Sequence, residues 1–445
     1  MAPPLPYRGQ PTPIPLVRYC RFFRGTGVSA STGQPQREQT DTGGPHRRAV
    51  KVAFFSESYL PYLNGVSISI RILYEELNRR GYEVWIYAPH FRGYKDPIPT
   101  VRRFPSIYTS FEPDYPIALP LALRLWREFR QQGFDVVHTH TPFFTGITGA
   151  RWARRLKIPL VSTYHTLYEE YLHYVPGFVP KGLVRRVLRA HLKRYYGGVD
   201  VVMAPSNIGA EVLRRYGVRQ PITPIRNPVL PFPEVTKDEA RSVLGIPQEV
   251  WMLLYVGRMA PEKNVHLLLQ AMPHILRGCA NAQLWLVGAG PALETLKAQA
   301  EALQLQDTVH FTGPVPREQV SLYLLAGDLF VFPSVTESQG LVLDEAQAAG
   351  LPCIVANGGG APEAVDYGAS GLVVDPTPEA FVEAVLFLTR HPEAHEKLSQ
   401  AGMKKRETLS VPAVVDRILA VYQQAQYRRD AELTARHAIQ KREGL

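Results

Sequence analysis

The feature that most constrains the fold of this chain is a repeated alternation of short apolar segments with longer amphipathic ones, beginning near residue 50. The short segments have strand character, and helix-like stretches separate most of them. They lie at residues 50–56, 83–88, 135–138, 159–164, 200–204 and 222–226, and again at 252–257, 283–288, 309–312, 329–333, 353–356 and 371–375. This alternation predicts an α/β fold with doubly wound parallel sheets. Because 445 residues exceed one typical core, we expect two such domains facing a central cleft.

Composition indicates where these domains begin and end. Residues 1–48 are rich in Pro, Gly and Arg and lack periodicity, which predicts a disordered N-terminal tail. A first domain is expected over residues 49–230 and a second over 231–411, because a proline-containing stretch separates the two alternations. Residues 412–445 begin with a helix that we expect to cross back to the first domain.

Charge and cysteine content narrow the class of protein. Residues 49–230 contain 25 Lys and Arg against 13 Asp and Glu, whereas residues 231–411 contain 12 against 21. A basic first half favours an anionic partner, either nucleic acid or an acidic lipid surface. The three cysteines are widely spaced, which favours a reduced, cytosolic setting. No apolar run reaches the roughly 18 residues of a membrane-spanning helix.

The most informative motif is TESQGLVLDEA at residues 336–346. It places Glu337 in a loop and Glu345 inside the helix that follows, with Gly340 at the junction. Unpaired amides at a helix start suit a phosphate, and carboxylates accept hydrogen bonds from hydroxyl groups. The motif therefore indicates a sugar-nucleotide site. The alternative is a solvated acidic loop followed by an exposed helix carboxylate.

Two cations follow the first strand of the second domain. Arg258 and Lys263 lie at its carboxyl end, where ligands bind in open α/β sheets. Fixed cations there could neutralise a diphosphate leaving group. The sequence contains no DxD and no cluster with metal-ligand spacing, so we expect neither a metal nor a separate cofactor. Solvated surface charges are the alternative.

Glycines mark the other strand ends. Gly65, Gly257 and Gly288 each lie where a strand leads into a loop or helix, and they would let backbone amides approach a phosphate. The loop before Gly65 lacks the GxGxxG fingerprint, which argues against an oxidoreductase. Backbone groups near Val315, after another strand, could bind a base edge. Ordinary turn glycines are the alternative.

Together these motifs resemble the retaining GT-B glycosyltransferases of the group 1 or family 4 type. The resemblance spans residues 50–425 and rests, in order, on Asn64-Gly65-Val66, Tyr164-His165-Thr166, Gly257-Arg258, Glu262-Lys263-Asn264, Gly288-Ala289-Gly290-Pro291, Phe311-Thr312-Gly313 and the pair Glu337 and Glu345. It implies two Rossmann-like domains. It also implies a retaining hexosyl transfer, with a nucleotide-sugar donor held mainly by the second domain and an acceptor held mainly by the first.

A narrower resemblance is to bacterial diacylglycerol glucosyltransferases. It lies in residues 162–174, where Tyr-His-Thr leads into an aromatic and acidic segment, and in Gln339, where many other family members carry an aromatic residue. Asp344 departs from the pattern, since a large apolar residue is commoner there. The resemblance implies UDP-glucose as donor and 1,2-diacylglycerol as acceptor, with acceptor contacts from Asn64, Tyr168, Tyr171 and His173. Aromatic packing under a loop is the alternative for this segment.

The resemblance also implies individual roles. Glu345 would bind the ribose, Glu337 the hexose hydroxyls, and His165 the transferred sugar near its reacting carbon. Together with Arg258 and Lys263, which would hold the diphosphate, Glu337 and His165 form the expected catalytic set. The expected donor-binding set is Gly65, Gly257, Arg258, Lys263, Gly288, Val315, Glu337, Gln339, Gly340, Leu341, Val342 and Glu345.

The segment Lys181–Tyr196 is the clearest membrane signal. Its apolar residues recur at helical spacing, and its charged residues are all basic: Lys181, Arg185, Arg186, Arg189, Lys193 and Arg194. A basic amphipathic helix binds anionic lipid, so we expect a peripheral protein on the cytoplasmic face of the cell membrane. The alternative is a core-facing helix with a solvated basic face. Nucleic acid is not an expected partner, because no recognised binding module accompanies the charge.

Three other functions remain open from the sequence, as does the oligomeric state. A phosphatidylinositol mannosyltransferase using GDP-mannose would share almost every motif. A soluble sugar-to-sugar transferase would not need the basic helix. From a different class, the chain could be a non-catalytic anionic-lipid binder, although the presence of Glu337, Glu345, Arg258 and Lys263 argues against a decayed site.

Overall fold

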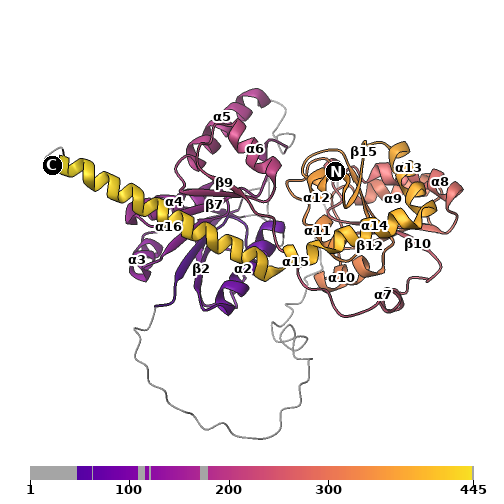
Figure 1. Cartoon of the computed structure of the whole chain (residues 1–445), viewed down its shortest axis with the longest axis horizontal. Coiled ribbons are helices and arrows are strands. Elements are labelled where there is room, and N and C mark those ends of the chain that lie inside the picture. The colour runs from indigo at the N-terminus through magenta and orange to yellow at the C-terminus, as the bar shows by residue number, and fades with distance from the viewer. Residues whose placement is uncertain (1–47, 63, 109–115, 120–121, 171–178, 443–445) are drawn as a thin grey trace, which may run out of the picture. The chain divides into compact units, whose positions relative to one another are not determined.

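The computed structural model describes residues 48–62, 64–108, 116–119, 122–170 and 179–442. It confirms the predicted α/β class, with two Rossmann-like domains that are called the first and second lobes below (Figure 1). The predicted tail, except Arg48, lies outside the described residues. No helix in the described part of the chain combines the length and the apolar character needed to cross a bilayer.

The first lobe is built on a seven-stranded parallel sheet. Its strand order is β3-β2-β1-β6-β7-β8-β9. The strands are β1 (Lys51–Phe55), β2 (Glu83–Pro89), β3 (Val101–Phe104), β6 (Val136–Thr139), β7 (Leu160–Thr163), β8 (Val201–Ala204) and β9 (Ile222–Pro224). Except for β3, whose two central residues are Arg102 and Arg103, these strands are largely apolar because helices cover both faces of a parallel sheet. A short antiparallel pair, β4 (Ser106–Ile107) and β5 (Ile117–Ala118), lies between β3 and β6 in the chain.

Side-chain alternation along β1 shows how the first lobe divides its core. Ala53 and Phe55 point into a cluster rich in aromatic rings, whereas Val52 and Phe54 point into the cluster on the opposite face. The helices of this lobe are α2 (Gly65–Arg79), α3 (Leu123–Gln132), α4 (Phe144–Leu156), α5 (Lys181–Tyr196) and α6 (Asn207–Arg215). The structure thus has α5 over the same residues that the sequence predicts for the basic helix.

The second lobe repeats this design with six parallel strands. Their order is β12-β11-β10-β13-β14-β15, the arrangement in which ligands bind beyond the carboxyl ends of the central strands. The strands are β10 (Trp251–Val256), β11 (Ala282–Val287), β12 (Val309–Gly313), β13 (Leu329–Phe332), β14 (Cys353–Ala356) and β15 (Gly371–Val374). The helices and short turns around them are α7 (Lys237–Leu244), η3 (Pro261–Lys263), α8 (His266–Gly278), α9 (Leu293–Ala302), α10 (Arg317–Ala326), α11 (Leu341–Ala348), α12 (Ala361–Ala364), η4 (Asp366–Gly368), α13 (Pro378–Arg390) and α14 (Pro392–Met403).

The chain passes between the lobes twice, and the two passages touch. The amide of Val229, after β9, donates to the carbonyl of Leu409 at 2.8 Å, just beyond α15 (Lys405–Thr408). The long helix α16 (Val411–Arg442) follows and runs along the first lobe (Figure 1). Its apolar side chains complete the cluster beneath the first sheet, to which it contributes Val414, Val415, Ile418, Val421, Tyr422 and Ala425.

Candidate active site

The predicted donor loop, residues 337–340, connects β13 to α11. Gly340 takes a left-handed conformation, with φ +75°, and a side chain there would meet Leu343 at 2.9 Å. Glycine therefore allows the chain to turn sharply into the helix. The first amides of α11, at Leu341 and Val342, lie at a helix start, where N–H groups lack intrahelical partners. This geometry suits an anion at the predicted phosphate position.

Glu337 is held by a cation from the loop after β10. Lys263 ends the turn η3, and its Nζ lies 2.6 Å from Oε1 of Glu337. The hydroxyl of Ser334 donates to the same carboxylate oxygen at 3.2 Å. The structure thus brings together two of the predicted catalytic residues. Both side chains are largely but not wholly enclosed, at 13% and 21% exposure, so their charges remain open to a ligand.

The other predicted donor residues of the second lobe lie at neighbouring strand ends. Arg258, which follows β10, is exposed, and its carbonyl accepts a hydrogen bond from Tyr255. Gly288 directly follows β11, and a side chain there would lie 2.1 Å from the carbonyl oxygen of Gly257. These two loops therefore approach each other more closely than a residue with a side chain would permit. Val315 packs against the apolar core of the lobe and is half-buried.

One predicted donor residue comes from the first lobe. Gly65 begins α2, and a side chain at this position would meet Leu341 of α11 at 3.1 Å. The starts of two helices from different lobes therefore lie against each other at the predicted phosphate position. Asn64 caps α2: its side chain accepts from the amide of Ser67, and the Ser67 hydroxyl accepts from the Asn64 amide. This cap occupies the side-chain oxygen of a residue predicted to contact the acceptor.

Glu345 has a partner that the sequence did not reveal. Its carboxylate forms an ion pair with Arg317, the first residue of α10. Glu345 is 8% exposed, and burial raises the pKa of its carboxyl group while the Arg317 guanidinium opposes that shift. Arg317 lies four residues after β12, so a basic residue after a strand end was the available signal. A ribose hydroxyl at Glu345 would also lie near this arginine.

The side-chain amide of Gln339 forms hydrogen bonds with other residues of the protein. Its Oε1 accepts from the amide and the Nδ2 of Asn227, and its Nε2 donates to Asp344 at 2.8 Å. Only 2% of the residue is exposed. Gln339 can therefore contact a donor through its backbone, whereas its amide group binds other residues of the chain.

His165 belongs to a cluster of three buried or partly buried histidines. Its Nε2 lies 3.1 Å from Nδ1 of His140, whose ring stacks at a tilt against His138. His138 in turn bonds Thr163 and the hydroxyl of Tyr422 on α16. Burial lowers the pKa of all three, to about 3 for His138, well below 6.5 for His140, and to about 4 for His165, which keeps more open surface. They are therefore neutral near pH 7.

The donor loop also touches the segment that carries His165. The hydroxyl of Ser338 donates to the carbonyl of His165 at 2.9 Å. This contact crosses from the second lobe to the first and places His165 beside the loop that contains Glu337. His138, His140 and His165 line a small cavity together with Ser69 and Asn227.

The predicted acceptor residues are only partly described. Tyr171 and His173 lie outside the described residues. Tyr168 packs edge-on against Phe143 and Tyr164, with ring centroids 5.1 Å and 5.8 Å away. Its ring is therefore part of the aromatic packing of the first lobe, which is the alternative the sequence left open for this segment.

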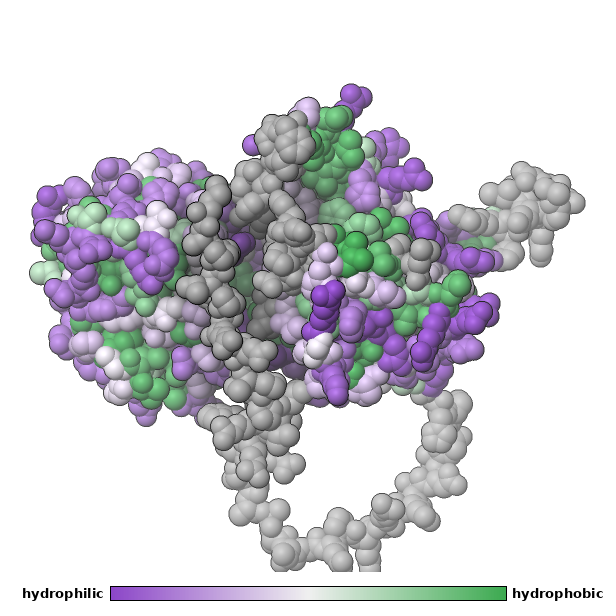
Figure 2. All heavy atoms as spheres, turned by 180° about the vertical axis from the view of Figure 1, so that it is seen from behind, coloured by the Kyte–Doolittle hydropathy of each residue, from purple (hydrophilic) through white to green (hydrophobic). Residues whose placement is uncertain are grey.

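The helix α5 is buried over its last turns alone. Leu192, Tyr195 and Tyr196 are buried, but Leu183 and Val187 are 59% and 60% exposed. Figure 2 shows apolar side chains at the surface of this helix with strongly polar ones beside them. The predicted apolar stripe therefore divides into a part that packs, including Leu188 and Leu192, and a part that faces outward.

The predicted basic residues of α5 are all exposed, but two of them are paired. Arg189 forms a two-pronged ion pair with Glu169, at 2.5 Å and 2.7 Å, and Arg185 lies 3.5 Å from the same carboxylate. Arg186, Lys193 and Arg194 are also exposed. Among the described residues no group of three or more His, Cys, Asp or Glu side chains could hold a metal ion.

Comparison with known proteins identifies the family. Residues 63–230 match the model described as Glycosyltransferase Family 4, and residues 236–405 match that described as Glycosyl transferases group 1. The alpha-monoglucosyldiacylglycerol synthase of Streptococcus pneumoniae is 33% identical over 317 residues, which cover 68% of this chain and 70% of that protein. The chain belongs to the GT-B glycosyltransferases. The predicted resemblance to diacylglycerol glucosyltransferases is thereby confirmed.

Other glycosyltransferases share this similarity. The alpha-monoglucosyldiacylglycerol synthase of Acholeplasma laidlawii is 28% identical, covering 79% of this chain and 91% of its own. A GDP-mannose-dependent alpha-mannosyltransferase of Corynebacterium glutamicum is 27% identical, covering 78% and 83%. Sucrose-phosphate synthase from Thermosynechococcus elongatus has a similar fold, with a TM-score of 0.67 at 22% identity over 84% of this chain and 99% of that one. Anabaena HepE in complex with UDP-glucose gives 0.66 at 18% identity, over the same shares.

Proposed function

We propose that this glycosyltransferase moves a glucosyl group from UDP-glucose to 1,2-diacylglycerol at the surface of an anionic membrane, with retention of the anomeric configuration. The observation that carries the proposal is the combination of the Lys263–Glu337 site with the exposed apolar and basic surface of α5. Two relatives named as alpha-monoglucosyldiacylglycerol synthases support the choice of lipid. HepE, whose structure contains UDP-glucose, supports the choice of donor through its shared fold.

The donor would be held mainly by the second lobe. Lys263, Arg258 and the first amides of α11 supply positive charge and N–H donors for the diphosphate, which gains charge as the glycosidic bond breaks. Glu337, oriented by Lys263 and Ser334, would accept hydrogen bonds from hexose hydroxyls. Glu345 would accept from the ribose. Because fixed cations perform the charge stabilisation, the proposed reaction needs no metal ion.

The transfer would take place beside His165. The hydroxyl oxygen of diacylglycerol forms a bond with the anomeric carbon as the bond from that carbon to the phosphate oxygen breaks, and the proton passes to the departing phosphate. Attack on the face from which the phosphate leaves gives retention. A lowered pKa keeps His165 neutral at pH 7, so it would contribute hydrogen bonding to the sugar, and the positive charge would come from Arg258 and Lys263.

The acceptor would be reached through α5. Leu183 and Val187 can enter the apolar edge of a bilayer while Arg186, Lys193 and Arg194 bind anionic headgroups. Glu169, paired with Arg189, directly follows the Tyr168 segment, so the basic helix is tied to the part of the first lobe that we assign to the acceptor. On this basis we propose a peripheral location on the inner face of the cell membrane.

A second candidate is transfer of mannose from GDP-mannose to an inositol lipid. The similarity to a GDP-mannose-dependent alpha-mannosyltransferase favours this candidate. The same phosphate and hydroxyl contacts would serve either donor.

A donor and acceptor screen tests the proposal. Radiolabelled UDP-glucose and GDP-mannose are each incubated with the purified protein and with vesicles that contain diacylglycerol or phosphatidylinositol, or with simple sugars. We expect a labelled lipid product from UDP-glucose and diacylglycerol, and about 10- to 100-fold slower formation of it by the Glu337→Gln variant under the same conditions. A product from GDP-mannose and phosphatidylinositol alone would replace the proposal with the second candidate.

A further inference from the structure

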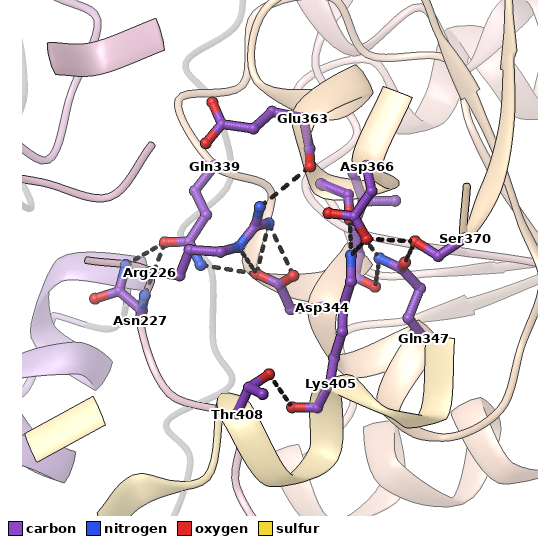
Figure 3. Close-up of polar contacts among 12 residues, drawn as sticks. Arg226, Asn227, Gln339, Asp344, Gln347, Glu363, Asp366, Ser370, Lys405 and Thr408 are labelled. Atoms are coloured by element: carbon purple, nitrogen blue, oxygen red, sulfur yellow. Dashed lines mark hydrogen bonds and ion pairs between the residues drawn. The ribbon is translucent and has the colours of Figure 1, made fainter. Parts of the chain in front are cut away.

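A partly buried polar network joins the donor loop to the end of the first lobe (Figure 3). Arg226 follows β9, and its guanidinium approaches Asp344 of α11 with both prongs: Nε donates to Oδ2 at 3.1 Å and Nη2 donates to it at 2.9 Å. Nη2 also lies 2.8 Å from Oδ1. The next residue, Asn227, donates to Gln339, which itself donates to Asp344. Four side chains therefore connect the two lobes at the start of α11.

Two polar side chains at the start of α11 are enclosed in this network, Gln339 at 2% and Asp344 at 0% exposure. A buried carboxylate is unfavourable unless a cation and hydrogen-bond donors accompany it. Arg226 and Asn227 supply these partners from the other lobe, so the four residues form one unit.

The network also reaches the first-lobe side of the proposed donor site. The hydroxyl of Ser69, on α2, donates to Oδ1 of Asn227 at 2.6 Å. The same helix begins at Gly65, which lies against Leu341 of α11. The remaining nitrogen of the Arg226 guanidinium, Nη1, donates to the carbonyl of Glu363 at 3.3 Å. The contacts of Arg226 and Asn227 thus surround the junction where the starts of α2 and α11 meet.

We propose that Arg226 and Asn227 are positioning residues for the donor loop. Arg226 sets the direction of the first turn of α11 through Asp344, and Asn227 sets residues 337–340 through Gln339. A planar guanidinium held by a carboxylate has a fixed orientation, which an apolar contact of the same size lacks. The proposal rests on the proposed function in one respect, namely that residues 337–342 bind the donor diphosphate.

The test separates positioning from stability with two variants. Arg226→Leu leaves the Asp344 carboxylate buried without its cation, so it should lower both the melting temperature and the affinity for UDP. The double variant Arg226→Leu, Asp344→Leu removes both charges and replaces them with apolar side chains, which often restores stability. We expect its melting temperature to return close to that of the parent. Its UDP affinity should stay about 10-fold weaker, because Gln339 has lost the carboxylate that orients it.

A matched control comes from a buried arginine of the second lobe that also pairs with a carboxylate. Arg241 is 3% exposed and pairs with Asp328, joining α7 to the start of β13, the end of that strand opposite the donor loop. Arg241→Leu should lower the melting temperature but leave UDP affinity within about 3-fold of the parent at a temperature where it is folded. The conservative variant Arg226→Lys, which keeps the charge but not the planar fork, should fall between the parent and the double variant in UDP affinity.

Hydrogen exchange gives a readout that needs no ligand. Amides of residues 336–343 should exchange faster in the double variant than in the parent, while those of β10 and β11 should be unchanged. If affinity returns together with stability in the double variant, or if exchange in residues 336–343 is unchanged, the positioning role is wrong. If the parent binds no UDP, the proposed donor is wrong instead. In that case hydrogen exchange in residues 336–343 still tests the positioning role. Affinity is then measured with the nucleotide that the donor screen identifies.

Discussion

Two helices of the molecule, α5 in the first lobe and α11 in the second, differ sharply in how they use their surfaces. Six of the eight residues of α11 are buried, against three of the sixteen residues of α5. Residues of both lobes contact α11, and its N-terminal end lies at the proposed donor site. By contrast, α5 packs against its own lobe near its C-terminal end, and its earlier turns are exposed to solvent. The comparison shows that one layered design can hold a helix to orient a small ligand or expose it for contact with a surface.

The largest expected effect lies on the α11 side of the comparison. Lys263→Ala removes the cation 2.6 Å from Glu337 and should lower turnover by about 10²-fold, the usual cost of losing one preorganised charge-stabilising donor. Arg258→Ala should behave similarly. Turnover is measured with saturating donor and diacylglycerol vesicles, with and without a chelator, which should have little effect.

A lysine that pairs with a carboxylate elsewhere in the second lobe provides the control. Lys237 pairs with Asp328, which precedes β13, whereas the donor loop follows that strand, and Lys237→Ala should retain turnover close to that of the parent. Near-normal turnover in Lys263→Ala would remove Lys263 from the site. Strict dependence on Mg²⁺ or Mn²⁺ would show that the metal-free proposal is wrong.

A somewhat smaller effect should divide the two glutamates near α11. Glu337→Gln should lower turnover about 10- to 100-fold while UDP still binds, because this carboxylate is assigned to the hexose. Glu345→Ala should weaken UDP binding about 10-fold, since it is assigned to the ribose. Calorimetric titration with UDP and turnover assays on both variants measure the two quantities. Equal loss of nucleotide affinity in both would contradict the separate roles.

Changes on α5 should affect vesicle binding and leave the donor site intact. The variant Leu183→Ser, Val187→Ser, Arg186→Gln removes exposed apolar groups and one cation without breaking the pairs that Arg185 and Arg189 make with Glu169. We expect binding to anionic vesicles to weaken by at least about 10-fold, because the lost cation alone contributes roughly 1 kcal/mol and the two lost apolar side chains add to it. Flotation of vesicles measures this, and hydrolysis of UDP-glucose in solution should be unchanged.

The matched control removes charge from the second lobe. Arg277 and Arg390 are exposed there, and their replacement by Gln should leave flotation unchanged. Binding of the parent should also fall as salt rises, because the Debye length shrinks from about 10 Å at 0.1 M to about 3 Å at 1 M. Equal binding of the α5 variant and the parent would show that this helix is not the membrane contact.

The smallest expected effect concerns how the free energy of unfolding depends on pH through His138, on β6 of the first sheet. His138, with a pKa lowered to about 3, is neutral when folded, so the unfolded chain binds an extra proton between pH 6.5 and about 3. Its stabilising contribution is present above pH 6.5 and is lost as pH falls through that window. Urea unfolding at pH 7.5 and pH 5 should therefore show a smaller pH dependence for His138→Gln than for the parent.

A buried carboxyl group of the first lobe works in the opposite direction. Glu57 follows β1, its Oε1 accepts from the Thr145 amide at 2.5 Å, and burial raises its pKa to about 7. The folded state therefore keeps a proton that the unfolded state releases between pH 4.5 and 7, and stability from this group is lost as pH rises through that range. Glu57→Gln should accordingly steepen the loss of stability on acidification, and an unchanged slope would contradict the assignment.

The sequence predicted the elements better than it predicted their partners. The strand runs and the limits of α5 followed from apolar content and helical spacing, which are local properties. The short strand β3 was missed because its two central arginines hide the apolar pattern. The stripe on α5 was predicted as one face, but Leu183 and Val187 lie on a different side from Val184, Leu188 and Leu192. An offset of one residue, about 100° around a helix axis, is enough to separate them.

The missed parts of the site are pairings between distant positions. Arg226 is separated from Asp344 by 118 residues, and Arg317 from Glu345 by 28. No periodicity or motif connects such residues, because their meeting depends on how the lobes and strand ends come together. Gln339 illustrates the limit: the motif located it at the donor loop, but only the structure shows that its amide group binds Asn227 and Asp344.

The path of α16 has a consequence for the order in which the protein is made. The cluster beneath the first sheet contains Val52 and Phe54 near one end of the described chain and Val414 and Tyr422 near the other. The ribosome makes these two segments hundreds of residues apart. The whole second lobe emerges between them. The second lobe can therefore complete its core during synthesis, whereas the first lobe, although translated earlier, finishes only when α16 arrives to cover it.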